Sequence, residues 1–291
     1  MTSLYPLPTA EHGIAMQRTR GAGRLSAKLS AGQSRIDRLF QEGSARIRLP
    51  RVSRGAPLEA VLINTAGGLT GGDRMDWHFE AGEGASLLLA TQACEKTYKA
   101  QGDSDARVSV QLNLNTGSSL AWLPQETILF DRARLARTID VTMAPDARLL
   151  MVEPVVFGRL AMREAVTEGQ FHDRWRIRCE GQLVHAEDMR LGPMVAETLR
   201  RPAVANGGLA MATVLMIAPD AEAVLAEARH LIGGSGGASH MTMRSGPSGA
   251  PATGKLLARI VAGDSYELRK VLVPLIRLLN PVGGMPKVWS I

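Results

Sequence analysis

Apolar and polar residues alternate with a period of two along much of the chain, and this pattern predicts β-strands. The alternation is clearest over residues 107–115 and recurs at 24–30, 46–49, 74–80, 138–143 and 171–179. Strands with one buried and one wet face are typical of antiparallel or β-helical sheets, because strands of a doubly wound parallel sheet are apolar on both faces. The sequence therefore predicts a mainly β protein.

A loose internal repeat begins at Gly84, at Gly117 and at Asp146, with spacings of 33 and 29 residues. Each copy opens a Leu-rich strand and continues into a polar stretch. Units of this size that bury one face against their neighbours are typical of stacked coils. We therefore predict a β-helix-like winding of many short strands, with an ordinary β-meander as the alternative.

Two helices are expected near the C-terminus. Asp220 can cap a helix over residues 221–232, which Gly233 would end. The string 264–267 is a capping box that opens a second helix over residues 268–279. Pro274 lies inside this second helix and predicts a kink.

The domain organisation predicted from the sequence is a single domain over residues 1–291. Residues 1–22 form a flexible arm in this interpretation. Residues 233–255 are rich in Gly, Ser and Pro and are predicted to be a mobile loop. No other segment has the composition of a linker.

Composition excludes several classes of protein. The 291 residues are 45% apolar, which is too much for a disordered chain, and thirty of them are glycines, which favours many turns. The sequence has no run of eighteen apolar residues and no basic-then-apolar leader, so we expect no membrane span and no secretory signal. Its two cysteines, Cys94 and Cys179, cannot build a disulfide framework, which favours the reducing cytoplasm.

The net charge of +6 is mild. The arginines appear scattered among acids and aromatic residues are few, which argues against a nucleic-acid binder. A solvated basic surface is the simpler interpretation, and a patch for an acidic partner protein is the alternative.

The sequence does not match the common nucleotide-binding and metal-binding motifs. Residues 249–255 match the spacing of a phosphate-binding loop, but Leu256 replaces the Ser or Thr that would bind magnesium. The glycines at 67–72 do not fit a dinucleotide-binding pattern and are expected to form tight turns. The six histidines are dispersed, so a closed metal cage is not expected, although carboxylates can handle a metal weakly.

Carboxylates beside turns and strands are the better candidates. They are Asp73, Glu126, Asp131, Glu153 and Glu164. The alternative for each is a solvated acid or one paired with arginine. Cys94 stands beside Glu95 and Lys96, which could lower the pKa of its thiol, but a small packed residue is the simpler interpretation.

Four strings carry a resemblance to a known family. They are Asn64–Arg74 (NTAGGLTGGDR), Thr91–Tyr98 (TQACEKTY), Trp122–Phe130 (WLPQETILF) and Gly158–Glu164 (GRLAMRE), and the chain ends in Pro286–Trp289. Their order and spacing, from about Gly23 to the C-terminus, resemble the urease accessory protein family UreD, also called UreH. Two departures are Arg163, where the family usually has glycine, and a long polar segment over residues 235–255.

The resemblance implies a scaffold and nickel metallochaperone component rather than an enzyme. Such a protein binds apo-urease and the helical accessory protein UreF, which recruits the GTPase UreG for GTP-dependent nickel insertion. The family fold is mostly β, helical in its winding, with two helices near the C-terminus. Nickel is thought to pass through an internal polar channel, so the resemblance implies no tightly bound cofactor, and GTP is bound by the partner.

Site residues follow from the matched strings. The five carboxylates named above, together with Gln92 and Cys94, are expected as weak nickel ligands along the channel. The structural motif residues are Gly67, Gly68, Gly71, Gly72, Pro124, Gly158 and Arg159. Arg269, Lys270 and Arg277 on the last helix are expected to meet the helical partner, the alternative being a solvated face over an apolar core.

Two other classes of function compete with this one. A β-helical carbohydrate hydrolase would need paired carboxylates and aromatic sugar platforms, but Trp77 and Trp175 fall on faces predicted to be buried. The scattered charge argues against a nucleic-acid-binding function.

Overall fold

The computed structural model describes residues 17–159, 164–243 and 253–290. The strands are β1 (Arg20–Ser30), β2 (Gln33–Gly43), β3 (Ala45–Arg48), β4 (Leu58–Asn64), β5 (Arg74–Ala81), β6 (Ser86–Thr91), β7 (Glu95–Thr97), β8 (Ala106–Leu114), β9 (Ser119–Leu123), β10 (Thr127–Leu129), β11 (Arg134–Met143), β12 (Arg148–Phe157), β13 (Gln170–Cys179), β14 (Gln182–Leu191), β15 (Ala210–Ala218), β16 (Gly236–Thr242) and β17 (Gly254–Ala262). The helices are α1 (Val195–Arg200), α2 (Leu225–Ile232) and α3 (Ser265–Leu279), with short 3₁₀ turns η2 (Gly233–Ser235) and η3 (Lys287–Ser290).

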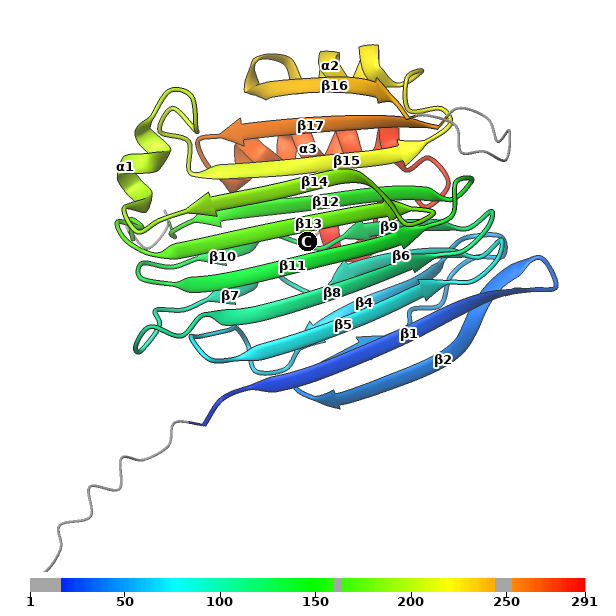
Figure 1. The fold of residues 1–291 in the computed structure, drawn as a ribbon, viewed down its shortest axis with the longest axis horizontal. Helices are drawn as coiled ribbons and strands as arrows, with labels where there is room; N and C mark the ends of the chain where they lie inside the picture. Colours follow the sequence, from blue (N-terminus) through cyan, green and yellow to red (C-terminus); the bar gives the residue numbers. More distant parts are fainter. Residues whose placement is uncertain (1–16, 160–163, 244–252, 291) are drawn as a thin grey trace, which may run out of the picture.

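The strands form two facing sheets (Figure 1). The first sheet has the order β14-β13-β11-β8-β5-β1-β2, and the second has the order β16-β17-β15-β12-β9-β6-β4-β3. From β4 to β13 the chain passes from one sheet to the other and back, apart from the short strands β7 and β10, which pair with each other at one side. This winding confirms the predicted mainly β, β-helix-like fold.

The repeat spacing is the distance along the chain between neighbouring coils. Ser86 of β6 lies beside Ser119 of β9, 33 residues later, and Ser119 lies beside Arg148 of β12. All three strands are parallel, so the loops that follow them meet at the same side of the solenoid. This stacking brings distant polar stretches together.

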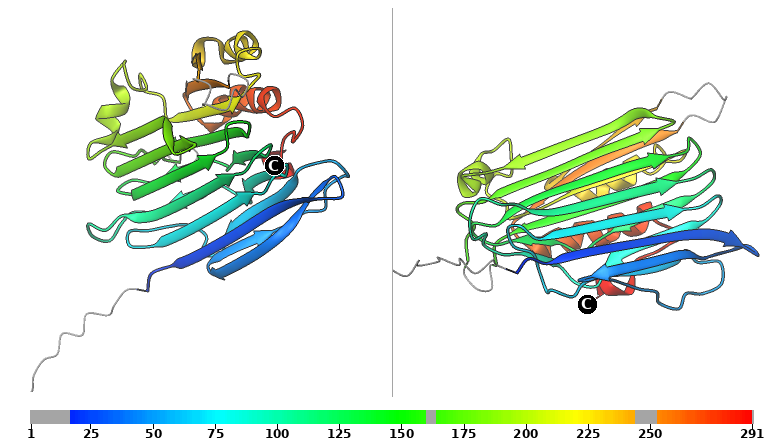
Figure 2. Two further views of the ribbon diagram at one scale, coloured as in Figure 1. Left: turned by 45° about the vertical axis from the view of Figure 1, so that its right-hand side comes forward. Right: turned by 60° about the horizontal axis from the view of Figure 1, so that its bottom comes forward.

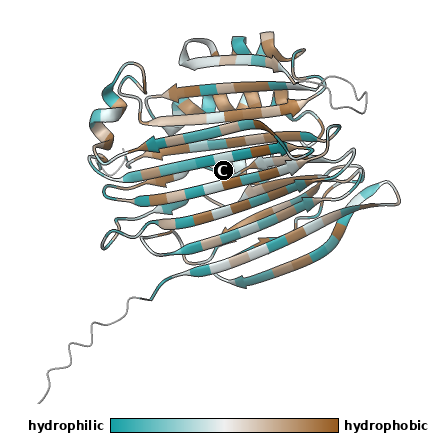
Figure 3. Cartoon of the chain, in the orientation of Figure 1, coloured by the Kyte–Doolittle hydropathy of each residue, from teal (hydrophilic) through white to brown (hydrophobic). Residues whose placement is uncertain are grey.

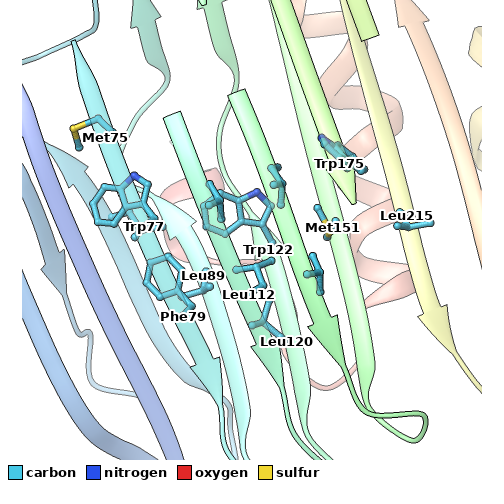
Figure 4. Close-up of a cluster of buried hydrophobic side chains, with 14 of the residues drawn as sticks. Met75, Trp77, Phe79, Leu89, Leu112, Leu120, Trp122, Met151, Trp175 and Leu215 are labelled. Carbon is cyan, nitrogen blue, oxygen red and sulfur yellow. The ribbon is translucent and has the colours of Figure 1, made fainter. Parts of the chain in front are cut away.

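The main core fills the space between the sheets. Figure 3 shows the alternation of hydrophobic and hydrophilic residues along the strands, and Figure 4 shows the inward side chains meeting between the layers. Trp77 stacks on Phe79 with ring centroids 6.1 Å apart, and Trp175 is fully buried. The prediction that Trp77 and Trp175 are buried, and so cannot serve as exposed platforms for sugar binding, is confirmed.

A second core joins the other face of the second sheet to α2 and α3 (Figure 2). Leu268, Leu272 and Leu275 of α3 are fully buried there. Asp264 caps α3, because its carboxylate accepts a hydrogen bond of 2.8 Å from the amide of Glu267, which confirms the predicted helix start at this cap. The helix itself begins at Ser265, three residues earlier than predicted, and the Glu267 carboxylate pairs with Lys270. Pro274 lies inside α3 as expected.

The first predicted helix begins later than expected. Residues 221–224 form turns, and α2 starts at Leu225. Asp220 does not cap it, because its carboxylate accepts hydrogen bonds of 2.7 and 3.0 Å from Arg148 instead. The short helix α1 had no counterpart among the sequence predictions.

The predicted loop over 233–255 is wrong where the structure describes it. Residues 236–242 form strand β16, which pairs antiparallel with β17. Gly236 serves close packing there, since a Cβ on it would collide with the carbonyl of Arg259. Residues 244–252 lie outside the described residues.

The predicted arm over 1–22 is likewise wrong at its end, because β1 begins at Arg20, and residues 1–16 are outside the described part.

Candidate functional site

A cavity of about 680 Å³, here called the outer cavity, lies where the loops after β6 and β9 meet the beginning of α3. Six residues singled out from the sequence line it: Gln92, Cys94, Glu126, Gly158, Arg159 and Arg269. The solenoid explains this convergence, because Gln92 and Gln125 occupy equivalent positions one coil apart. The Gln125 side-chain amide donates a 2.9 Å hydrogen bond to the carbonyl of Gln92, and this bond ties the two loops together.

Glu126 is buried at the wall of the outer cavity. Its two carboxylate oxygens accept hydrogen bonds of 2.6 and 2.7 Å from Nε and Nη2 of Arg269. Burial acts to raise the pKa of Glu126, but the hydrogen bonds and charge of Arg269 outweigh burial and hold the pKa below its usual value. Glu126 is therefore an anion with a built-in cation partner.

Cys94 donates a 3.4 Å hydrogen bond from Sγ to Glu126. Burial, with the neighbouring charge of Glu126, raises the pKa of this thiol to about 11. The idea that its sequence neighbours lower the pKa is wrong in direction, because the fold places Cys94 against a carboxylate. At neutral pH Cys94 is a thiol, and binding of a metal to its sulfur would release a proton.

Arg269 lies at the cavity rather than on an outer helix face. Its guanidinium also stacks over the ring of Trp289 at 5.3 Å, and Trp289 donates a 2.9 Å hydrogen bond to the carbonyl of Leu123. The other two residues predicted to bind the helical partner, Lys270 and Arg277, are exposed. Lys270 forms a 2.8 Å ion pair with Glu267.

A buried charge cluster lies deeper in the solenoid. Arg137 donates hydrogen bonds of 2.9 and 2.7 Å to Asp173 and forms an ion pair with Glu153. Trp122 donates a 2.7 Å hydrogen bond to the other oxygen of Glu153. Burial raises the pKa of Glu153 to about 7, with Arg137 opposing and Asp173 adding to this shift. Burial acts to lower the pKa of Arg137, but the two carboxylates outweigh it.

This cluster borders an inner cavity of about 60 Å³, which Pro124 and Glu95 also line. A side cavity of about 240 Å³ is lined by Gly67, Gln92, Cys94 and Glu95 among others. The inner and outer cavities share Gln125, the inner and side cavities share Glu95, and the side and outer cavities share Cys94. The three cavities therefore adjoin one another around a few polar side chains.

Glu95 lies between the inner and side cavities. Its carboxylate accepts hydrogen bonds of 3.2 and 3.3 Å from Asn64. Burial raises the pKa of Glu95 to about 7, and the hydrogen bonds from Asn64 oppose the rise. Near neutral pH this carboxyl group exchanges its proton readily.

Three predicted ligands are placed elsewhere, with their oxygens already engaged. Both carboxylate oxygens of Asp73 accept 2.8 Å hydrogen bonds from main-chain amides of Thr19 and Thr70. Asp131 accepts bonds of 2.8 and 3.1 Å from amides of the 167–168 segment. Glu164 forms a 2.6 Å ion pair with Arg159. The structure does not bring these acids together with Glu126.

The family glycines mark positive-φ turns or close approaches of the backbone. Gly68 and Gly158 have φ values of 148° and 83°, and a Cβ on Gly158 would lie 2.5 Å from the carbonyl of Glu164. Gly71 is buried and would collide with the carbonyl of Ser104 if it carried a side chain. Gly72 has a φ of 92°. The tight turns predicted for residues 67–72 are confirmed at Gly67, Gly68 and Gly72, where φ is positive. Arg163 lies outside the described residues.

Sequence reasoning missed Arg137, Asp173 and Glu95. The position of a residue in the strand alternation could have identified two of them. Arg137 occupies an inward position of β11 between Leu135 and Ile139, and Asp173 occupies an inward position of β13. A charged residue at an inward position requires a partner of opposite charge. Arg137 and Asp173 are direct neighbours in the β11–β13 register.

Several alternatives find no support in the described residues. Lys255 ends the string 249–255, which has the spacing of a phosphate-binding loop. It lies within β17 and donates a 2.8 Å hydrogen bond to the carbonyl of Val184. No group of three His, Cys, Asp or Glu side chains in the described ranges is close enough to hold a metal ion. None of the helices in the described part of the chain has the length and hydrophobicity needed to cross a membrane.

Comparison with known proteins identifies the family. The model of the UreD urease accessory protein family matches residues 19–290. A urease accessory protein UreD of Mesorhizobium japonicum is 52% identical over 275 residues, which cover 94% of this chain and 95% of that protein. A urease accessory protein UreD 1 of Brucella abortus is 50% identical over 279 residues, with 96% of each chain covered. The chain therefore belongs to the UreD family of urease accessory proteins, which are accessory proteins rather than enzymes.

Proposed function

We propose that this chain is a nickel metallochaperone component acting in the cytoplasm. It binds apo-urease and a UreF-like helical accessory protein, and through that protein it works with a UreG-like GTPase. Nickel is cargo in transit rather than a resident cofactor, and GTP is bound by the GTPase. The accessory role is common to the family, and the route of the metal is the further step proposed here.

The observation that carries this route is the chain of adjoining cavities. The outer, inner and side cavities meet at Gln125, Cys94 and Glu95, and the buried acids Glu126 and Glu153 border them. In a solenoid the interior between the sheets runs along the stack, so polar residues placed in phase with the core can line a continuous path. We infer that nickel enters at the outer cavity and moves past these oxygens.

The donors suit transport because each acid is already compensated. Glu126 is held by Arg269, Glu153 by Arg137, and Glu95 by Asn64. A metal ion gains only the difference between its own interaction and the one that it replaces, so it binds weakly and leaves easily.

The test is co-expression with the urease subunits and the other accessory proteins, followed by measurement of nickel per urease active site. Glu126→Gln, Glu95→Gln and Glu153→Gln are compared with Glu227→Gln, which is exposed on α2. We expect reduced nickel content with the first three and wild-type content with the control. Co-purification of the complex is measured in parallel, so that loss of nickel with an intact complex marks the metal route. Normal nickel content in all three cavity variants would reject the route.

A further inference from the structure

Positive charge is concentrated at the N-terminal end of the solenoid. Residues 17–54, which include β1, β2 and β3, hold ten Lys and Arg against two Asp and Glu, a net charge of +8 in a chain whose total is +6. The remainder of the chain is therefore slightly acidic. Most basic residues lie elsewhere in the chain, where acids balance them, but the net positive charge is concentrated in this one structural unit.

These charges face solvent. Nine of the ten basic side chains are exposed, and Arg18 is half-buried. Within the described residues, the ion pairs of the exposed members involve one acid, Asp37, which lies 3.0 Å from Lys28 and 3.6 Å from Arg38. A cluster of like charges on one surface raises the local positive potential and favours an acidic partner.

Apolar side chains are exposed on the same unit. Ile36 and Leu39 of β2 lie opposite Ala27 and Leu25 of β1 and so point to the core side, yet they are 42% and 43% exposed. Phe40, on the other face, is 46% exposed. The strand β2 ends the first sheet (Figure 2). Exposed apolar residues beside a charged rim are typical of protein interfaces.

We propose that this β1–β3 end is a docking surface for an acidic protein partner. A second copy of the chain fits poorly, because two +8 surfaces repel. The edge strand β2 is also irregular, since the register with β1 shifts between Ser26 and Ala27 and skips Asp37. Single-stranded nucleic acid requires aromatic faces for stacking, but the ring of Phe40 is covered by Arg24 at 5.5 Å. The apolar strip of Ile36 and Leu39 favours a protein over a phosphate backbone or lipid headgroups.

The position in the fold allows a second partner to bind at the same time. In Figure 1, β1 and β2 lie at the bottom of the molecule, whereas α2 and β16 lie at the opposite end. A protein bound at the β1–β3 end therefore leaves the helical layer uncovered. This inference rests on the proposed function, because the partner is taken to be one of the proteins of urease assembly.

The experiment uses purified apo-urease and the UreF-like protein as separate probes, with the full chain immobilised. The test variant is Arg35→Glu/Arg38→Glu, and its matched control is Arg107→Glu/Arg178→Glu, with equal charge change at exposed positions of the same sheet. For one probe we expect the test variant to bind about tenfold more weakly and the control to bind about as wild type does. Raising NaCl from about 50 to about 300 mM should remove most of that difference.

A second variant, Ile36→Ser/Leu39→Ser, should weaken the same complex at both salt concentrations, because it removes apolar contact rather than charge. Unchanged affinity of both probes for both variants would overturn the docking surface, as would equal weakening by the control. Duplex DNA and vesicles of anionic lipid are run as further probes. Charge-dependent binding of these alone would also overturn it. Urease nickel loading with the wild-type chain is measured separately, so failure of the surface and failure of the proposed function are distinguishable.

Discussion

Arg269 on α3 holds Glu126 by two hydrogen bonds across 143 residues of sequence, with donor–acceptor distances of 2.6 and 2.7 Å. The guanidinium thus occupies both oxygens of an acid that lines the outer cavity. A divalent cation can bind Glu126 only by displacing or sharing this partner. The pair also joins the helical layer to the solenoid, so it couples the cavity to the position of α3.

Arg269→Gln should increase the affinity of the purified chain for Ni²⁺, because Glu126 loses its competing cation. A tenfold increase corresponds to about 1.4 kcal/mol, which is the scale expected for one removed charge near the surface. Isothermal titration with NiCl₂ measures this. Arg277→Gln, exposed on the same helix, is the control and should leave the affinity unchanged. Equal affinity of wild type and Arg269→Gln would mean that Glu126 does not bind the metal.

Arg137→Met should be strongly destabilising, because it leaves Glu153 and Asp173 buried without their shared cation. Breaking a buried ion pair in this way costs about 3–5 kcal/mol. Urea denaturation gives the change in the free energy of unfolding. The triple variant Arg137→Met/Glu153→Gln/Asp173→Asn removes all three charges and should recover part of the loss. A single variant as stable as wild type would mean that the cluster contributes little to folding.

The raised pKa of Glu95 predicts a pH dependence of stability. The folded chain keeps this proton up to about pH 7, whereas an unfolded Glu loses it near its ordinary pKa of 4.5. Between these values the folded state binds more protons, so the free energy of unfolding falls as the pH rises, by at most about 1.4 kcal/mol per unit. The difference between wild type and Glu95→Gln, measured by urea denaturation from pH 4.5 to 7, isolates this contribution. A difference that does not change with pH would contradict the assignment.

The β-solenoid was predictable because it follows from local patterns. Strand alternation defines the inward face, and the spacing of 33 and 29 residues sets the coil length that places Ser86, Ser119 and Arg148 side by side. The helix cap at Asp264 is also local, with its acceptor and donor three residues apart. Such features require no knowledge of distant contacts.

The errors came from long-range contacts. Asp220 had the right residue type for a helix cap, but Arg148 binds its carboxylate from another coil. Arg269 looked like a surface residue because Glu126 is far away in sequence. The glycine-rich composition concealed strand β16, in which Gly236 is required because the backbone of β17 at Arg259 approaches so closely. In each case a partner more than ten residues away decides the structure.

Gly68→Ala should disrupt the loop before β5 far more than Gly67→Ala. Both glycines have positive φ values, so either substitution carries the backbone strain of a left-handed residue, about 1 kcal/mol. A Cβ at Gly67 would meet no atom within 4 Å, whereas at Gly68 it would collide with the ring of Tyr98 and lie 2.7 Å from the carbonyl of Lys96. Because Tyr98 packs on Phe130 at 5.0 Å, the clash is passed on to a second coil. We expect a loss of about 1 kcal/mol for Gly67→Ala and at least about 2 kcal/mol more for Gly68→Ala, measured by urea denaturation. Equal losses for the two variants would show that the contact with Tyr98 relaxes without cost.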